Sequence, residues 1–176
     1  ADIGYILLPT FLDTNVDDAV RVALQEMTAD GPLDGLILDN RLNGGGSGDV
    51  TETVLSFFTS GFQGGSAGPG GSRDFNITAE DIGGSQSVPL VILADRDTVS
   101  YAEVFTVALQ LSGRATVIGA RTAAGFLGGL AMGDEMHQRN VACSALNLRA
   151  LAPHLAKVGA DAAELSKILA FIAGNE

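Results

Sequence analysis

The stretch VPLVILADRDTVSYAEVFTVALQL, residues 88–111, joins an apolar run to a helical pattern through a short polar loop. Val88 to Ala94 has the length and apolar character of a strand that is buried on both faces. From Tyr101 to Leu111, apolar residues recur at helical spacing. Ser100 stands between the two elements, at the start of the expected helix. A serine at this place is typically a helix cap, so any chemical role for it needs support from other parts of the chain.

The same alternation of strand and helix continues on both sides of this stretch. We expect further buried strands at Ile3 to Leu8, Gly35 to Leu38 and Ala115 to Gly119, and helices at Val16 to Met27 and at about Val50 to Phe58. Short apolar strands that alternate with helices predict an α/β fold with a mostly parallel sheet covered on both faces.

Two segments interrupt this pattern. Thr59 to Ser87 is rich in glycine and serine, and we interpret it as a long, partly mobile excursion, which in a compact domain is usually functional or disordered. The string GGSAG, residues 64–68, matches G-x-S-x-G, but we expect no strand before it and no helix after it, so we interpret it as a chance match. Near the end of the chain, Asn147 to Val158 and Asp161 to Ala173 predict a helical hairpin. We therefore divide the chain into a core, 1–142, and a C-terminal helical segment, 143–176.

Composition excludes several classes of function. The 176 residues include 21 acidic and 10 basic side chains, a net charge of −11, which argues against a nucleic-acid partner. No apolar run approaches the roughly 18 residues of a membrane span. Cys143 is the single cysteine, which rules out an internal disulfide and a thiolate metal cluster, and we interpret it as buried and inert. Asp134, Glu135 and His137 are interpreted as solvated rather than as ligands, so we expect neither metal nor cofactor.

A glycine loop, DNRLNGGG at residues 39–46, follows the second expected strand. Three successive glycines let backbone N–H groups converge, which suits a phosphate or the oxyanion of acyl transfer. The dinucleotide fingerprint fails because Asp49 stands where its last glycine is needed, and no Walker lysine follows. We call the loop between the strand at 88–94 and the helix at 101–111 the Ser100 loop. The glycine loop and the Ser100 loop both follow expected parallel strands, where α/β proteins place their sites.

Four blocks, in this order, resemble the carboxyl-terminal processing (tail-specific) serine proteases. The glycine loop resembles their D-L-R-x-N-G-G-G segment, VPLVIL (88–93) their P-L-V-V-L strand, TVSYAEVF (98–105) their T-x-S-x-[SA]-E-x-F motif, and GRATVIG (113–119) their G-R-A-x-V-x-G strand. The resemblance extends from about Ile3 to Gly125. It implies a ClpP/crotonase-like fold, a spiral of ββα units, and a hydrolase that cleaves peptide bonds in a protein or peptide substrate.

The same resemblance implies the site residues and the location of the protein. Ser100 would be the nucleophile that forms an acyl-enzyme, and the backbone N–H groups of Gly46 and Tyr101 would form the oxyanion hole. At position 46, we expect glycine because the backbone must approach the substrate carbonyl closely. An exported protein is implied, although nothing after Ala1 has the shape of a signal peptide.

The general base is where this sequence departs from the family pattern. Gly125 stands where the best-known members carry a lysine, and Leu111 replaces an acidic residue. The loop that begins Arg121-Thr122-Ala123 resembles instead the branch of the tricorn-like proteases and the interphotoreceptor retinoid-binding proteins. In the tricorn-like enzymes, this implies a histidine supplied from upstream. Within this chain, His137 and His154 remain the candidate bases.

Three functions therefore stay open at this point. The first is a serine endopeptidase core, and the second is a binding module on the same fold for a peptide or an apolar ligand. The third is a crotonase-like acyl-CoA enzyme that uses paired N–H groups without needing Ser100. The apolar stripe of the two C-terminal helices would also allow self-association.

Overall fold

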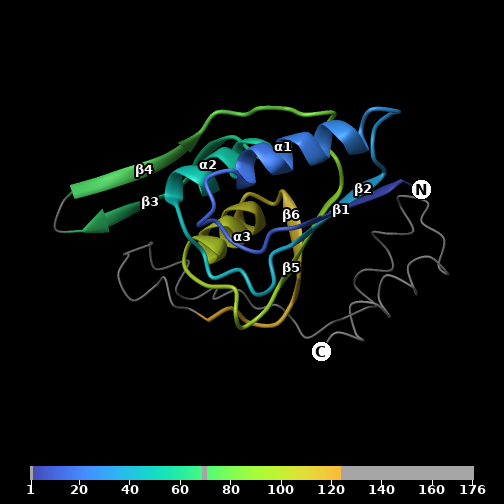
Figure 1. Cartoon of the computed structure of the whole chain (residues 1–176). Coiled ribbons are helices and arrows are strands. Elements are labelled where there is room, and N and C mark those ends of the chain that lie inside the picture. Colours follow the sequence, from blue (N-terminus) through green and yellow to red (C-terminus); the bar gives the residue numbers. More distant parts are fainter. Residues whose placement is uncertain (1, 69–70, 124–176) are drawn as a thin grey trace.

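A computed structural model describes residues 2–68 and 71–123 of the chain (Figure 1). The elements along these residues are β1 (Ile3–Leu7), α1 (Val16–Met27), β2 (Gly35–Asp39), α2 (Gly48–Ser56), β3 (Gly61–Gly68), β4 (Gly71–Ile77), β5 (Leu90–Ala94), α3 (Tyr101–Leu111) and β6 (Ala115–Gly119). All the strands and helices expected within 2–58 and 88–119 are present, and their observed ends differ from the expected ends by at most two residues.

Four strands form a parallel sheet in the order β1-β2-β5-β6, which confirms the predicted α/β class. The centre of the sheet is the pair β2 and β5, with Asp39 beside Leu93 at their carboxyl ends. The glycine loop and the Ser100 loop begin directly after these two neighbouring strand ends. The sheet topology therefore brings residues about 60 positions apart to one edge of the molecule.

The hydrophobic core lies on one face of this sheet. Alternate strand residues such as Ile6, Leu38 and Ile92 share a single buried cluster with side chains from α1, α2 and α3. On the opposite face, Tyr5 and Leu7 of β1 are 45% and 55% exposed. The expectation that helices cover both faces is therefore wrong for the described residues, because all three of their helices pack against the same face.

Within the excursion at 59–87, the structure has a hairpin that the sequence did not predict. β3 and β4 pair antiparallel, with an irregular register between Phe62 and Gly65, and the hairpin extends away from the sheet (Figure 1). Phe75 and Ile77 are buried at the base of β4, so apolar residues alternate with polar ones there as in a half-buried strand. The G-x-S-x-G string lies inside β3, which confirms that it is not a nucleophile elbow.

Arg114 joins the start of β6 to two other parts of the core. Its Nε donates to the carbonyl oxygen of Phe58 at 2.9 Å, and its Nη2 donates to the carbonyl oxygen of Ser85 at 2.7 Å. Burial lowers the pKa of this guanidinium from its ordinary value, yet the group stays charged. The arginine of the GRATVIG block thus satisfies two backbone acceptors and fixes the connection that leads into β5.

The predicted helical hairpin and the boundary at residue 142 lie outside the described residues. Within those residues, the helices are too short or too polar to cross a bilayer.

Candidate active site

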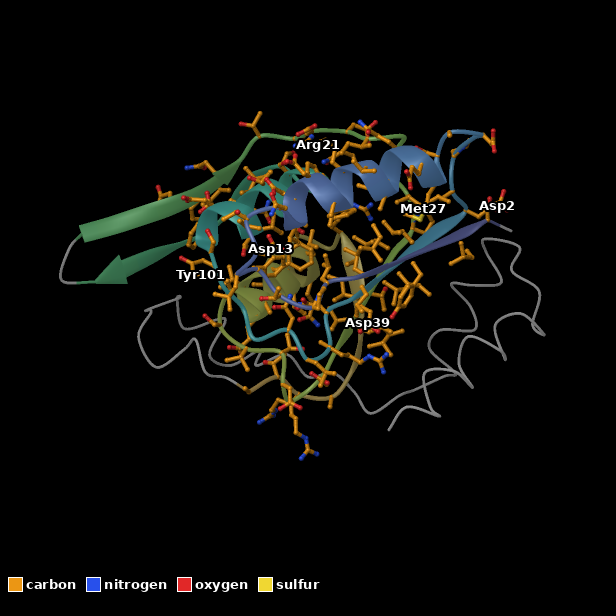
Figure 2. The ribbon with its side chains drawn as sticks, in the orientation of Figure 1. Asp2, Asp13, Arg21, Met27, Asp39 and Tyr101 are labelled. Carbon is orange, nitrogen blue, oxygen red and sulfur yellow. The ribbon has the colours of Figure 1, made fainter. Side chains whose placement is uncertain are left out.

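The glycine loop begins at Asp39, whose carboxylate is hydrogen-bonded by two other side chains. Figure 2 labels Asp39, at the end of β2. Its carboxylate accepts hydrogen bonds from Arg41 Nε and Nη2 at 2.9 and 2.7 Å, and from Tyr5 Oη at 2.6 Å. Burial alone would raise the pKa of Asp39, but the hydrogen bonds from Arg41 and Tyr5 outweigh it and lower that pKa. Burial and the bond to Asp39 raise the pKa of Tyr5 to about 12. This cluster fixes the chain at the entry to the loop.

At its other end, the loop is bound to the segment that follows β1. The Phe11 N–H donates to the carbonyl oxygen of Gly45, and the Ser47 N–H donates to that of Phe11, both at 2.8 Å. A Cβ on Gly46, whose φ is +149°, would lie 2.1 Å from the Phe11 carbonyl carbon. Glycine at 46 is therefore required by contact with Phe11, a reason other than the substrate approach that we expected. No described residue accepts a hydrogen bond from the Gly46 N–H.

The middle of the loop lies directly against Ser100. Gly45 has a φ of +86°, and a Cβ there would lie 2.8 Å from Ser100 Cβ and 2.9 Å from the Tyr101 backbone nitrogen. The Tyr101 ring lies over Gly48 at the start of α2, where a Cβ would be 2.8 Å from the phenol oxygen (Figure 2). The structure thus brings the three residues predicted for the nucleophile and the oxyanion hole to one place.

Ser100 has a backbone conformation that an ordinary helix cap does not have. It occupies the N-cap position of α3 with φ 58° and ψ −128°, whereas N-cap residues typically have extended backbone. A positive φ in a residue with a side chain is strained and is concentrated at functional sites. A strained serine between a strand and a helix is also the arrangement of a nucleophile elbow. The geometry therefore favours a chemical role over simple capping.

Glu103 holds this strained residue in place. Its Oε2 accepts the Ser100 N–H at 2.8 Å, and its Oε1 accepts the Thr122 hydroxyl at 2.9 Å. This buried carboxylate thus ties the Ser100 loop to the loop that follows β6. Sequence reasoning missed both residues in these roles. The pattern Ser-x-x-Glu at 100–103 was the available signal, because it is the signature of a capping box.

The structure does not place every candidate residue. His137, His154, Cys143 and Gly125 lie outside the described residues, as do Asp134 and Glu135, which we interpret as solvated. The chain has no lysine or histidine before His137, so the described part offers no such base for Ser100. In that part, no three His, Cys, Asp or Glu side chains are grouped as metal ligands would be.

The C-terminal residues match a different protein from the core. Residues 126–176 match the sequence model of the oxamate carbamoyltransferase subunit AllG. The AllG protein of Escherichia coli (strain K12) is 48% identical over 44 residues, which are 25% of this chain and 10% of that protein. The boundary that we expect at residue 142 stays a prediction.

Most of the chain matches peptidases. The C-terminal processing peptidase, chloroplastic, of Tetradesmus obliquus is 35% identical over 121 residues, which are 68% of this chain and 25% of that protein. The solved structure of the photosystem II D1 C-terminal processing protease matches at 33% identity and a TM-score of 0.63, over 70% of this chain and 31% of that one. A lipoprotein from Streptococcus agalactiae, 21% identical over 70% of this chain and 48% of its own, shares the fold with a TM-score of 0.55.

The chain thus spans about a quarter of the length of the processing peptidase, and a tenth of AllG. The sequence model for peptidase family S41 covers residues 2–132, which include the whole glycine loop and the Ser100 loop. With this match over well more than half of its length, the chain belongs to peptidase family S41.

Proposed function

We propose that this chain is the catalytic core of a serine endopeptidase of the carboxyl-terminal processing type. The observation that carries the proposal is the strained Ser100, with the glycine loop pressed against it and against the Tyr101 backbone nitrogen. The family match supports a peptidase over the two alternatives, a binding module and an acyl-CoA enzyme.

In the proposed reaction, Ser100 Oγ attacks the carbonyl carbon of the scissile peptide bond and gives its proton to a general base. The negative charge that develops on the carbonyl oxygen is stabilised by the N–H groups of Gly46 and Tyr101, at the positive end of α3. The C–N bond then breaks, the amine leaves with the proton, and an acyl-enzyme on Ser100 remains. Water hydrolyses this ester and restores the serine.

The base is supplied from outside the described residues, and of the two candidates in this chain, His137 and His154, we propose His137. An imidazole with an ordinary pKa accepts a proton near neutral pH, so a histidine base predicts a rate that falls as the pH drops below about 6.5. A His137→Gln variant should lose the reaction with substrate, while His154→Gln should keep it. The reverse result would assign the base to His154, and two active variants would exclude both.

A fluorophosphonate probe tests the nucleophile directly, because it phosphonylates activated serines. We expect a single label, located by mass spectrometry on Ser100, and no label in Ser100→Ala. Ser112→Ala is the matched control, since Ser112 lies at the other end of α3 and should leave labelling unchanged. An unlabelled wild-type chain, or equal labelling of Ser100→Ala, would refute the proposal. Binding of a fatty acid or a retinoid that survives Ser100→Ala would then support the binding module.

Two finer properties belong to the same proposal. The protein would act on protein substrates after export, in line with the relative that is named chloroplastic.

The C-terminal helices expected at 147–173 would join two copies of the chain. Light scattering after size exclusion tests this, because Leu165→Asp and Ile168→Asp should return a dimer to a monomer; a wild-type monomer would refute it.

A further inference from the structure

Four polar side chains from the glycine loop, the Ser100 loop and α3 are completely buried. Asn40, Asn43, Thr98 and Thr106 each have 0% exposure. A buried amide without partners would destabilise the fold by several kcal/mol, so side chains of this kind are found where each polar atom has a partner. The partners in this case connect α3 to the glycine loop.

The connection passes through two asparagine side chains. Asn40 Nδ2 donates to the Ala102 carbonyl oxygen and to Thr106 Oγ1, both at 2.9 Å and both on α3. Asn43 Nδ2 donates to Asn40 Oδ1 at 2.8 Å. Asn43 Oδ1 in turn accepts the Gly45 N–H at 2.9 Å. An unbroken series of hydrogen bonds therefore runs from the first turns of α3 to the residue before Gly46.

The backbone of Asn40 and Asn43 strengthens the same link. The Thr98 hydroxyl donates to the Asn40 carbonyl oxygen at 2.9 Å, and the Val99 N–H donates to that of Asn43 at 2.9 Å. The two loops are thus bound together on both sides of Ser100. At position 40, the family segment D-L-R-x-N-G-G-G has leucine, which has no polar atom to make such a link.

The bond from Asn43 to the Gly45 N–H has a geometric consequence. It fixes the orientation of the peptide group before Gly45, and the carbonyl oxygen of Gly45 is fixed by the Phe11 N–H. With both peptide groups of Gly45 held, the direction of the Gly46 N–H is fixed relative to α3. Hydrogen-bond donors stabilise an oxyanion only when they are aimed in advance at the place where the charge develops.

We propose that Asn40 is a positioning residue, which sets the glycine loop relative to Ser100 through Asn43. This inference rests on the proposed function of the site. Asn40 contacts no substrate in this account; it acts by keeping the Gly46 N–H aligned with the nucleophile on α3.

The test compares Asn40→Leu, which installs the family residue, with Asn40→Ser, which shortens the side chain without adding bulk. Thr106→Val is an intermediate variant, because it removes one of the two acceptors of Asn40 on α3 and leaves the bond between Asn40 and Asn43. Ser85→Ala is the control, because Ser85 is also buried and hydrogen-bonded but lies in another part of the core.

Two measurements on the full chain separate positioning from simple stability. Amide hydrogen exchange, followed by NMR, reports the Gly45 N–H, and the rate of fluorophosphonate labelling reports Ser100. We expect both Asn40 variants to raise exchange at Gly45 by about tenfold, the loss of one hydrogen bond. We expect labelling to slow by about 10- to 100-fold, as for a displaced oxyanion donor. Thr106→Val should have a smaller effect than the Asn40 variants, and Ser85→Ala should stay near the wild-type rate.

The outcomes distinguish this inference from the proposed function. If wild-type Ser100 is not labelled, the proposed function fails and the inference fails with it. If Ser100 is labelled in the wild type and equally fast in both Asn40 variants, the positioning role alone is refuted. A purely structural role would raise exchange throughout α3 and β2 in proportion to the loss of global stability, without a selective effect at Gly45, and that result would also refute it.

Discussion

Gly45→Ala is the substitution that most directly tests the contact between the glycine loop and Ser100. The new methyl group would lie 2.7 Å from the Val99 carbonyl oxygen, 2.8 Å from Ser100 Cβ and 2.9 Å from the Tyr101 backbone nitrogen. Two of these three atoms belong to the backbone, so no side-chain rotation can relieve the contact. The φ of +86° adds strain for any residue that has a Cβ.

The expected loss of stability in Gly45→Ala follows from the close contacts and from the backbone strain. Left-handed backbone in a residue with a side chain raises the free energy of the fold by about 1–2 kcal/mol, and overpacking adds about 1–3 kcal/mol. We therefore expect the free energy of unfolding to fall by about 2–5 kcal/mol, which in a chain of this size lowers Tm by about 4–20 °C. The loop relieves the overlap by moving away from Ser100, and a displacement approaching 1 Å slows acylation by about 100-fold.

Gly44→Ala is the matched control for this experiment. Gly44 is the preceding residue, it has no positive φ, and no atom lies within 4 Å of a Cβ built there. Thermal unfolding and the rate of fluorophosphonate labelling should both stay near wild type in this variant. If Gly45→Ala and Gly44→Ala behave alike in the two assays, the close packing of the loop against Ser100 is refuted.

Two further predictions concern charged groups that the fold buries. The lowered pKa of Asp39 means that its contribution to stability is complete above about pH 4 and is lost as the pH falls through the pKa of the folded state. The stability difference between wild type and Asp39→Asn, measured by urea unfolding, should therefore shrink below about pH 4; a constant difference would show that the carboxylate charge is not involved. Arg114→Met removes the donors to the carbonyl oxygens of Phe58 and Ser85 and should lower the free energy of unfolding by about 2–4 kcal/mol. Arg96→Met, at an exposed position, should change it by less than about 0.5 kcal/mol, and equal losses would contradict the role given to Arg114.

The strands and helices that carry the site were predictable because their signals are local. The apolar runs that became β1, β2, β5 and β6 have the length of buried strands, and α3 has the bounds that its spacing predicted. The hairpin of β3 and β4 was missed because glycine and serine dominate its sequence, and the alternation at Phe75 and Ile77 is too short to stand out. For the described residues, the expected coverage of both faces of the sheet was wrong for a different reason: an apolar strand does not show which side the helices pack on.

The sequence predicted the candidate site as a set of residues, whose catalytic roles stay predictions, and it did not predict the geometry of the site. The order of the blocks pointed to Ser100, Gly46 and Tyr101, and the structure brings these together. The buried Glu103 carboxylate accepts the N–H of the strained Ser100, and the Ser-x-x-Glu pattern signals this capping box but not the positive φ. The Asn40 link was missed because it joins positions 62 and 66 residues apart, whose proximity results from the pairing of β2 with β5.

The contact between Phe11 and the glycine loop has a consequence for folding during synthesis. The segment after β1, the glycine loop and the start of α3 are separated by about 35 and 55 positions, and closing such loops is slow compared with forming a single helix. A chain still leaving the ribosome has synthesised Phe11 and Gly46 long before Ser100, and has no assembled site. Under the proposed function, the site stays incomplete until β5 has paired with β2 and both Ser100 and the general base have been synthesised. During synthesis, the proposed protease would therefore be unable to cut either its neighbours or itself.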